Sequence, residues 1–348
     1  MLPNACCGCM TVLRSGHLFL VLLVVPSGLA NNSAGLASEG TCGTEEGNGC
    51  PSSPTRSATA SPQNMDGLET GVPHALRAGA SETASTSARL RVLLIRHGES
   101  TNNVLFKALE QEHKAGSISL DEARTRWFEQ RSHDPDITAA GITQAQSMAA
   151  GLRDALREAG VVLACSPMKR ALRTAQALAE ALSAPVLVQP DMFEVGGIYG
   201  KRRDDGKGFH EASGFTPKEL KSEFAFADTS LLPPEGPWNA GIGKESVADT
   251  RARTLRATQW LRSKATHDMV RRHAGGDKSD PRLVVVLHSD LIDLIMKTVL
   301  AQATEVDQVP WNQFQVITDN TSVSELLVPV EGADAKPTLE YVNRMVST

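Results

Sequence analysis

The sequence predicts an α/β fold, a three-layer sandwich in which a mostly parallel central sheet carries helices on both faces. Four short apolar runs have the length and the β-branched content of buried strands, and helical patterns separate them. These runs are RVLLI at 91–95, VVLACS at 161–166, PVLVQ at 185–189 and LVVVL at 283–287. Strands that are apolar on both faces and alternate with helices are typical of parallel sheets.

The helical segments have identifiable ends. The segment from Thr138 to Gly160 begins with an N-cap residue and ends with a glycine, which favours a helix over this stretch. After the second strand, Ser166 is the expected N-cap of a helix that runs to about Leu182. Two further helical patterns cover 245–263 and 291–300.

Residues 1–30 have the pattern of a targeting leader. Arg14 precedes the apolar run LFLVLLVV (Leu18 to Val25), and small residues follow at Gly28 and Ala30. The run is short for a membrane span. A secretory signal peptide is the favoured interpretation and predicts a protein of the secretory pathway. An uncleaved membrane anchor, an organelle-targeting leader and a wrongly assigned gene start are the alternatives.

Residues 31–88 differ in composition from the rest of the chain. They are rich in Ser, Ala, Gly, Thr and Pro and lack apolar periodicity. A segment of this kind buries too little apolar surface to offset its chain entropy, so we expect it to be disordered. Clear periodicity begins at Arg91, which predicts one folded domain over 89–348.

Composition argues against two kinds of site. The formal net charge of -5 and the 4% aromatic content give no basis for a nucleic-acid partner. No Cys/His spacing matches a zinc site, so no metal is expected. Cys165 lies in the second apolar run and is expected to be a buried, inert thiol, whereas Cys42 and Cys50 could pair in an exported protein.

Basic side chains follow three of the predicted strands. The first strand ends at Arg96 and His97, the second leads within one helical turn to Arg170, and the fourth ends at His288. The carboxyl ends of parallel strands meet at one edge of a sheet, where ligands bind. Cations that converge there are stable only with a shared anion, and a phosphoryl group fits because its oxygens accept forked guanidinium hydrogen bonds.

Four motifs on these elements resemble those of the histidine phosphatase superfamily, the phosphoglycerate-mutase-like group. They are RHGESTNN, DPDITAAGITQA, SPMKRALRTAQAL and VVVLHSDLID, in the same order and at similar separations. The resemblance implies that His97 is a nucleophile that accepts the phosphoryl group. It also implies that Arg96, Arg170 and His288 bind the phosphoryl oxygens, without a metal or another cofactor.

The resemblance also assigns three further residues. Glu194, which follows the third strand, corresponds to the general acid of the family, although its glycines follow more closely than is usual there. Asn103 corresponds to an asparagine that binds the phosphate or orients a neighbour. Ser289 stands where the family commonly has glycine, and its backbone N–H can still donate to the phosphate.

Four more charged residues have structural interpretations. Asp290 and Asp293 are expected to be capping and helix-surface groups rather than catalytic residues. Glu245 and Arg253 resemble a recurrent Glu-Ser…Arg pattern of the family, for which a capping or buried ion-pair role is expected.

The sequence favours a phosphomonoester hydrolase, with two alternatives. Cofactor-dependent phosphoglycerate mutases extend the first motif with a tryptophan and a downstream acidic-aromatic segment, and RHGESTNNVLFKALEQ has neither. A non-catalytic phosphate- or phosphopeptide-binding module needs only the arginines. The expected partner is a small phosphorylated substrate or a phosphoprotein, selected by the loops 104–135 and 195–245. A membrane is a partner only through an uncleaved leader, and nothing in the sequence specifies an oligomeric state.

Overall fold

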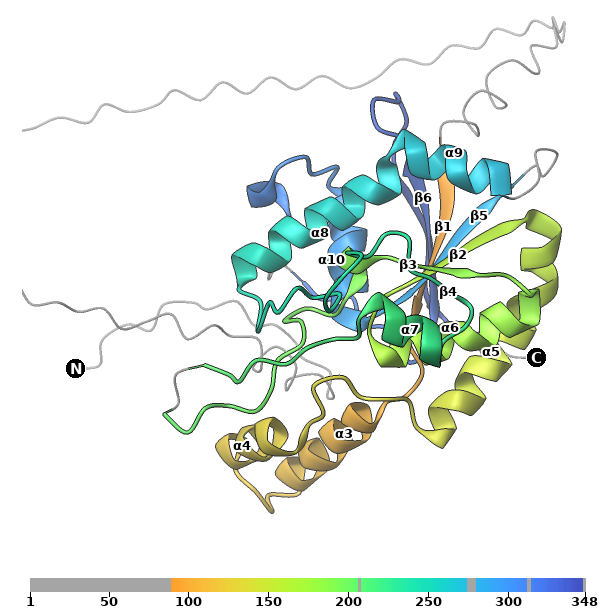
Figure 1. Ribbon diagram of the computed structural model, residues 1–348. Helices are drawn as coiled ribbons and strands as arrows, with labels where there is room; N and C mark the ends of the chain where they lie inside the picture. Colours follow the sequence, from red (N-terminus) through yellow and green to blue (C-terminus); the bar gives the residue numbers. More distant parts are fainter. Residues whose placement is uncertain (1–88, 206–207, 274–279, 312–313, 347–348) are drawn as a thin grey trace, which may run out of the picture. The chain divides into compact units, whose positions relative to one another are not determined.

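The computed structural model describes residues 89–205, 208–273, 280–311 and 314–346 (Figure 1). The leader and the disordered segment predicted for residues 1–88 lie outside the described residues, as do all cysteines except Cys165. No helix within the described ranges is long and apolar enough to cross a membrane.

A seven-stranded sheet forms the centre of the described domain, in the order β4-β3-β2-β5-β1-β6-β7. The strands are β1 (Arg89–Arg96), β2 (Val161–Cys165), β3 (Val186–Val188), β4 (Ala227–Asp228), β5 (Arg282–Leu287), β6 (Val323–Pro329) and β7 (Thr338–Arg344). Strands β1 to β5 pair in parallel, and β6 is antiparallel to both of its neighbours. The predicted, mostly parallel sheet is confirmed, and β4, β6 and β7 are added at its edges.

Helices cover both faces of the sheet because its strands are apolar on both faces. On β1, Leu93 and Ile95 face the cluster that contains α5 (Ala139–Ala159), α6 (Lys169–Leu182) and α7 (Pro217–Glu223). Val92 and Leu94 face the opposite cluster. That cluster contains α8 (Val247–Arg262), α9 (Lys264–His273) and α10 (Ser289–Leu300) (Figure 1). The three-layer architecture is therefore confirmed.

Two of the expected helix ends are confirmed and one is wrong. The Thr138 hydroxyl accepts a hydrogen bond from the N–H of Gly141, and Gly160 ends α5 with a φ of 80°. Helix α6 begins at Lys169 rather than directly after Ser166. Its first N–H donates to Asp134, and the Ser166 hydroxyl instead contacts His288. Ser166 belongs to the site described below and is not the N-cap.

A helical hairpin occupies most of the insertion 104–135, whose structure could not be predicted. It consists of α3 (Thr101–Lys114) and α4 (Leu120–Gln130) and lies beside the sheet rather than on either face (Figure 1). Leu109, Ile118 and Ala123 form its own small apolar cluster, against which Trp127 packs. Two 3₁₀ turns, η1 (Pro190–Met192) and η2 (Val306–Gln308), complete the regular elements of the described residues.

Candidate active site

A cavity of about 370 Å³ opens at the carboxyl ends of β1 and β2 and the start of α10. The predicted site residues that line it are Arg96, His97, Asn103, Arg170, Glu194 and Ser289. His288, the remaining predicted residue, is fully buried, with its ring centroid 5.2 Å from that of His97. The structure thus brings together all seven side chains, which are separated by up to 193 positions in the chain (from Arg96 to Ser289).

The surroundings of His97 determine which ring nitrogen carries the lone pair. Its Nδ1 lies 2.7 Å from the carbonyl oxygen of Gly98, an acceptor only, so Nδ1 carries the proton and Nε2 the lone pair. Arg170 Nε donates to that Nε2 at 3.1 Å. Burial, followed by the charges of Arg170 and Arg96, holds the pKa of His97 well below its usual range. His97 is therefore a neutral, oriented nitrogen base.

Two glycines allow the loop after β1 to contact the start of α5. A Cβ at Gly98 would lie 2.6 Å from the carbonyl oxygen of Gly141, and a Cβ at Gly141 would lie 2.2 Å from that of Glu99. The glycine of RHG is thus required by a close backbone contact within the protein. This contact holds the backbone that follows His97 against the start of α5.

The site contains two arginines, of which Arg170 is buried and Arg96 is partly buried. Burial lowers the pKa of Arg170, and the carboxylates of Glu194 and Asp134 oppose that shift. Burial also lowers the pKa of Arg96, whose Nη1 donates to the carbonyl of Thr318. The Nε of Arg96 has no hydrogen-bond partner among the described residues. A phosphoryl oxygen would supply the acceptor that this environment lacks.

His288 lies behind His97, away from the cavity lining. Its Nε2 is 2.8 Å from the Ser166 hydroxyl, and its Nδ1 has no partner within the described part of the chain. Burial, then Arg170 and His97, holds the pKa of His288 well below its usual range. The ring is therefore neutral in the free protein, next to the nucleophile.

Glu194 is held between its own loop and the start of α10. Its Oε1 accepts hydrogen bonds from the N–H groups of Val195 (2.9 Å) and Leu291 (3.3 Å). Burial raises its pKa, and Arg170 opposes the shift. Gly196 and Gly197 form the tight turn after it with φ values of 88° and 71°, which the closely following glycines make possible. The carboxyl group retains its proton to a higher pH than an exposed glutamate does.

The expected ion pair of Glu245 and Arg253 stabilises the loop that carries Glu194. Arg253 Nε donates to Glu245 at 2.7 Å, and both side chains are less than 5% exposed. The Nη1 of the same arginine donates to the carbonyls of Asp191 and Phe193. The ion pair therefore fixes the backbone directly before Glu194.

Asn103 and Ser289 occupy the expected positions at the cavity wall. The Oδ1 of Asn103 accepts from the N–H and hydroxyl of Ser100 at the start of α3 and from Nδ2 of Asn320. This amide of Asn320 also donates to the carbonyl of His97. The Ser289 hydroxyl lies 3.2 Å from that of Thr318. Asn103 thus orients the loop that carries His97.

The surface interpretation of Asp290 and Asp293 was wrong. Asp290 lines the cavity, and burial followed by the charge of Glu194 raises its pKa to about 8. Asp293 is buried, where its Oδ2 accepts from Lys297 at 2.8 Å. The segment after η2 covers this part of α10, with Gln315 donating to Asp290 and the N–H of Val316 to Asp293. Because a segment distant in the sequence covers these two carboxyl groups, no pattern near them indicated their environment.

Two further residues near Arg96 and Arg170 were not predicted from the sequence. Asp134 accepts the first N–H of α6 and lies 4.0 Å from Arg170, and burial raises its pKa to about 6. Its place in the DPDIT motif was the available signal. Arg131, which follows α4, also lines the cavity, and it belongs to none of the four motifs.

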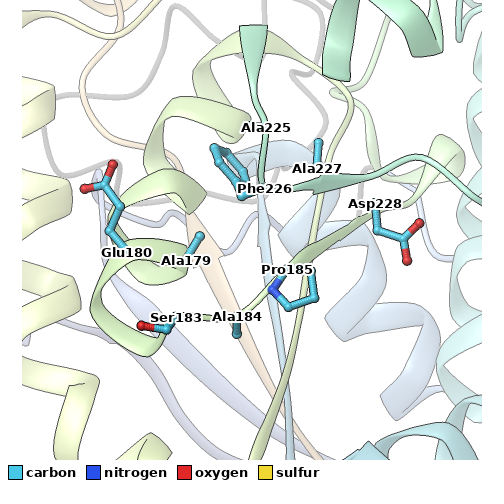
Figure 2. Close-up of a pocket in the computed structure, with 9 residues that line it drawn as sticks. All are labelled: Ala179, Glu180, Ser183, Ala184, Pro185, Ala225, Phe226, Ala227 and Asp228. Carbon is cyan, nitrogen blue, oxygen red and sulfur yellow. The ribbon is translucent and has the colours of Figure 1, made fainter. Parts of the chain in front are cut away.

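A second hollow lies away from this site, between the end of α6 and the β3–β4 edge (Figure 2). Its charged lining residues, Glu180 and Asp228, are both acidic, so it lacks the cations that a phosphate needs. Cys165 also lies outside the active site, buried under α6 with a thiol whose pKa is raised by burial, as expected for an inert cysteine. Across the described ranges, no group of three or more His, Cys, Asp or Glu residues could hold a metal ion.

The chain belongs to the histidine phosphatase superfamily (branch 1), whose family model matches residues 92–343. The resemblance stated from the four motifs is therefore confirmed. A search of curated proteins found no match.

Several solved structures are similar to this chain at low sequence identity. Mycobacterial hydrolase 1 is 20% identical, with a TM-score of 0.43, and the match covers 74% of this chain and 100% of that one. A putative alpha-ribazole-5'-P phosphatase from Escherichia coli is 17% identical (TM-score 0.43, 74% and 98% covered). A mycobacterial glucosyl-3-phosphoglycerate phosphatase in complex with VO3 is 19% identical (TM-score 0.41, 73% and 99% covered).

Proposed function

We propose that the protein is a phosphomonoester hydrolase that acts through a phosphohistidine at His97, with Glu194 as general acid and then general base. The observation that carries this proposal is the pairing of a neutral His97, whose Nε2 lone pair faces Arg170, with a buried carboxyl group in the same cavity. A nitrogen nucleophile surrounded by cations and a carboxyl group of raised pKa are the two parts that phosphoryl transfer from an ester requires.

In the first step, His97 displaces the alcohol. The Nε2 lone pair forms a bond to phosphorus while the bond from phosphorus to the ester oxygen breaks, and Glu194 gives its proton to the departing oxygen. Arg170 turns its Nε–H from the imidazole to a phosphoryl oxygen, and Arg96 binds another. Their charge stabilises the oxygens of the transition state, which carry most of the negative charge.

In the second step, water releases the phosphate. Glu194, now ionised, removes a proton from a water molecule whose oxygen attacks phosphorus, and the bond to Nε2 breaks. The products are inorganic phosphate and a neutral His97, with the proton back on Glu194. The hydrogen bond from Nδ1–H of His97 to the carbonyl of Gly98 favours a ring orientation that serves both steps.

A panel of phosphate esters, assayed with and without bisphosphoglycerate, tests this proposal against the two alternatives. A hydrolase releases inorganic phosphate in the absence of bisphosphoglycerate, whereas a mutase depends on it and interconverts phosphoglycerates. A binding module has no turnover to lose, so Glu194→Gln distinguishes the third case. Release of phosphate that survives Glu194→Gln unchanged would contradict the proposed role of this carboxyl group.

A further inference from the structure

The outer wall of the cavity carries a cation that the proposed chemistry does not use. Arg131 ends α4 and lines the cavity, with its backbone N–H donating to the carbonyl of Trp127. Its charge lowers the pKa of Arg170, so the two guanidinium groups lie within electrostatic range of each other. Arg131 therefore lines the same cavity as Arg96 and Arg170, close enough for its charge to act on the phosphate-binding arginine.

Among the described residues, no carboxylate compensates the charge of Arg131. Its Nη1 donates to the carbonyl of Tyr199 at 3.3 Å, and its guanidinium carbon lies 4.0 Å from the centre of the Tyr199 ring. Burial lowers the pKa of Arg131, and no Asp or Glu of the described ranges opposes that shift or lies within ion-pair distance. A half-buried guanidinium without an anion loses hydration that a carbonyl and a ring restore only in part.

Two other partly buried arginines show how such a charge is compensated elsewhere in the domain. Arg173 bonds to Asp136 and Glu223, and Arg126 of α4 bonds to Glu112. Arg131 has no such acid among the described residues. A bound ligand can supply the missing anion.

A second cation lies next to Arg131, outside the lining of the cavity. Lys244 Nζ lies 4.7 Å from the ring centre of Phe209 and 5.6 Å from that of Tyr199, which places Arg131 and Lys244 at the same aromatic ring. Partial burial, then the charge of Arg131, lowers the pKa of Lys244. The rings of Tyr199, Phe209 and Phe128 pack on one another with centroids 4.7 and 5.2 Å apart. Three separate segments thus hold this wall together.

We infer that Arg131, extended by Lys244, forms a second anion-binding subsite, and that the preferred substrate is a phosphomonoester whose leaving group carries another anionic group. The inference rests on the proposed function for the identity of the first site. The scissile phosphate binds at Arg96 and Arg170, and the remote phosphate or carboxylate binds at Arg131. The carbon chain that joins these two anionic groups of the substrate runs along the aromatic wall, where Trp127 and Tyr199 also line the cavity.

Calorimetric titration with non-hydrolysable ligands tests this subsite without requiring turnover. Three series of increasing chain length are compared on the full chain, in buffer free of divalent cations: alkylphosphonates, α,ω-alkanebisphosphonates and ω-phosphonocarboxylates. At a matching length, the second anion is expected to tighten binding by at least about tenfold over the alkylphosphonate, because it compensates a desolvated charge. The bisphosphonate and carboxylate series identify which remote anion is preferred.

Substitutions assign the effect to Arg131. Arg131→Gln keeps an N–H donor for the Tyr199 carbonyl, removes the charge and is expected to abolish the advantage of the second anion. Lys244→Ala, at an exposed position, is expected to reduce it. Arg126→Gln, which removes a paired arginine outside the cavity, is the matched control and retains the advantage. The inference is overturned if no chain length shows an advantage, or if Arg131→Gln retains it. Hydrolysis of the ester panel tests the proposed function independently of this result.

Discussion

A histidine can serve as a nucleophile at neutral pH only if it is unprotonated and one nitrogen is exposed to the substrate. At His97 the carbonyl of Gly98 binds one nitrogen, and the charges of Arg170 and Arg96 disfavour protonation of the other. The same two arginines bind the group that the histidine attacks in our proposal. The neutral state of His97 and the binding of the substrate therefore depend on the same two arginines.

Removal of one arginine tests this dependence. Arg170→Ala is expected to lower kcat by at least about two orders of magnitude, because it removes a preorganised donor to the transition-state oxygens. Steady-state kinetics on the best ester of the panel measures the loss. Lys169→Ala is the control, since this neighbouring side chain pairs with Asp136 and Glu223 outside the cavity. A kcat for Arg170→Ala close to that of Lys169→Ala would contradict the assignment.

The pair formed by Asp290 and Glu194 predicts a specific pH dependence. A general acid must be protonated, so kcat/KM falls as the pH rises through its pKa. Burial raises the pKa of both carboxyl groups, and the charge of Glu194 raises that of Asp290 further, so Asp290 keeps its proton while Glu194 ionises. Asp290→Asn replaces one neutral group with another and is expected to leave the alkaline limb of the kcat/KM profile in place. A limb that moves to lower pH in this variant would show that Asp290 ionises first and would contradict this order of titration.

Among single residues, those that lie in a motif could be predicted from the sequence, and those that a distant segment covers could not. Arg96, His97, Arg170 and Glu194 follow strands, so the edge of the sheet indicated their place. Asp290 was misinterpreted because an acid in the first turn of a helix is commonly a solvated capping group. Its burial depends on Gln315 and the segment around it, which lies 25 positions further along the chain.

At the scale of elements, apolar continuity decided what the sequence could indicate. The four continuous apolar runs became β1, β2, β3 and β5, all buried on both faces. Strand β6 was missed because Glu325 interrupts its apolar run. That carboxylate is buried and forms an ion pair with Arg91 of the neighbouring strand, a compensation that only the pairing register reveals. The α3–α4 hairpin was missed because its few apolar residues pack mainly on one another.

Helix α8 stabilises the acid loop through one arginine, and this predicts a coupled loss of stability and activity. Arg253→Ala leaves Glu245 buried without its partner and is expected to lower the free energy of unfolding by about 3–5 kcal/mol. It also frees the carbonyls of Asp191 and Phe193, so the turnover of the folded fraction should fall. Urea unfolding and steady-state kinetics measure the two effects.

A control for this prediction lies one turn further along the same helix. Arg256 is 56% exposed and pairs with Asp191 at the surface. Arg256→Ala is expected to cost about 1 kcal/mol or less and to leave turnover near the wild-type value. If both variants lose the same stability and activity, the buried pair has no special role in holding the loop.

At the scale of the whole domain, the topology explains why the cavity forms where it does. After β1 the chain passes through the α3–α4 hairpin to α5, and after β2 it continues to α6, both on one face of the sheet, whereas it leaves β5 toward α10 on the other. Connections that diverge to opposite faces leave a crevice at the carboxyl ends of the strands between them. His97, Ser166 and His288 each follow one of these strands, so the strand order β2-β5-β1 brings them together.

The domain boundary is a further prediction at this scale. Apolar periodicity starts at residue 91, and the first strand of the described residues spans Arg89–Arg96. Removal of residues 1–85 is therefore expected to leave a soluble domain with the kcat/KM of the full chain. Circular dichroism, thermal unfolding and the ester assay compare the two forms. An insoluble or inactive product would show that the boundary is wrong.

Identification of the phosphorylated residue during turnover is the decisive experiment for a phosphohistidine at His97. The protein is mixed with a radiolabelled phosphate ester, quenched rapidly in alkali and digested, and the labelled peptides are identified. We expect an acid-labile, base-stable phosphate on the peptide that contains His97, and no label in His97→Ala. A label on Ser100 or Cys165, or turnover that survives His97→Ala, would contradict this mechanism.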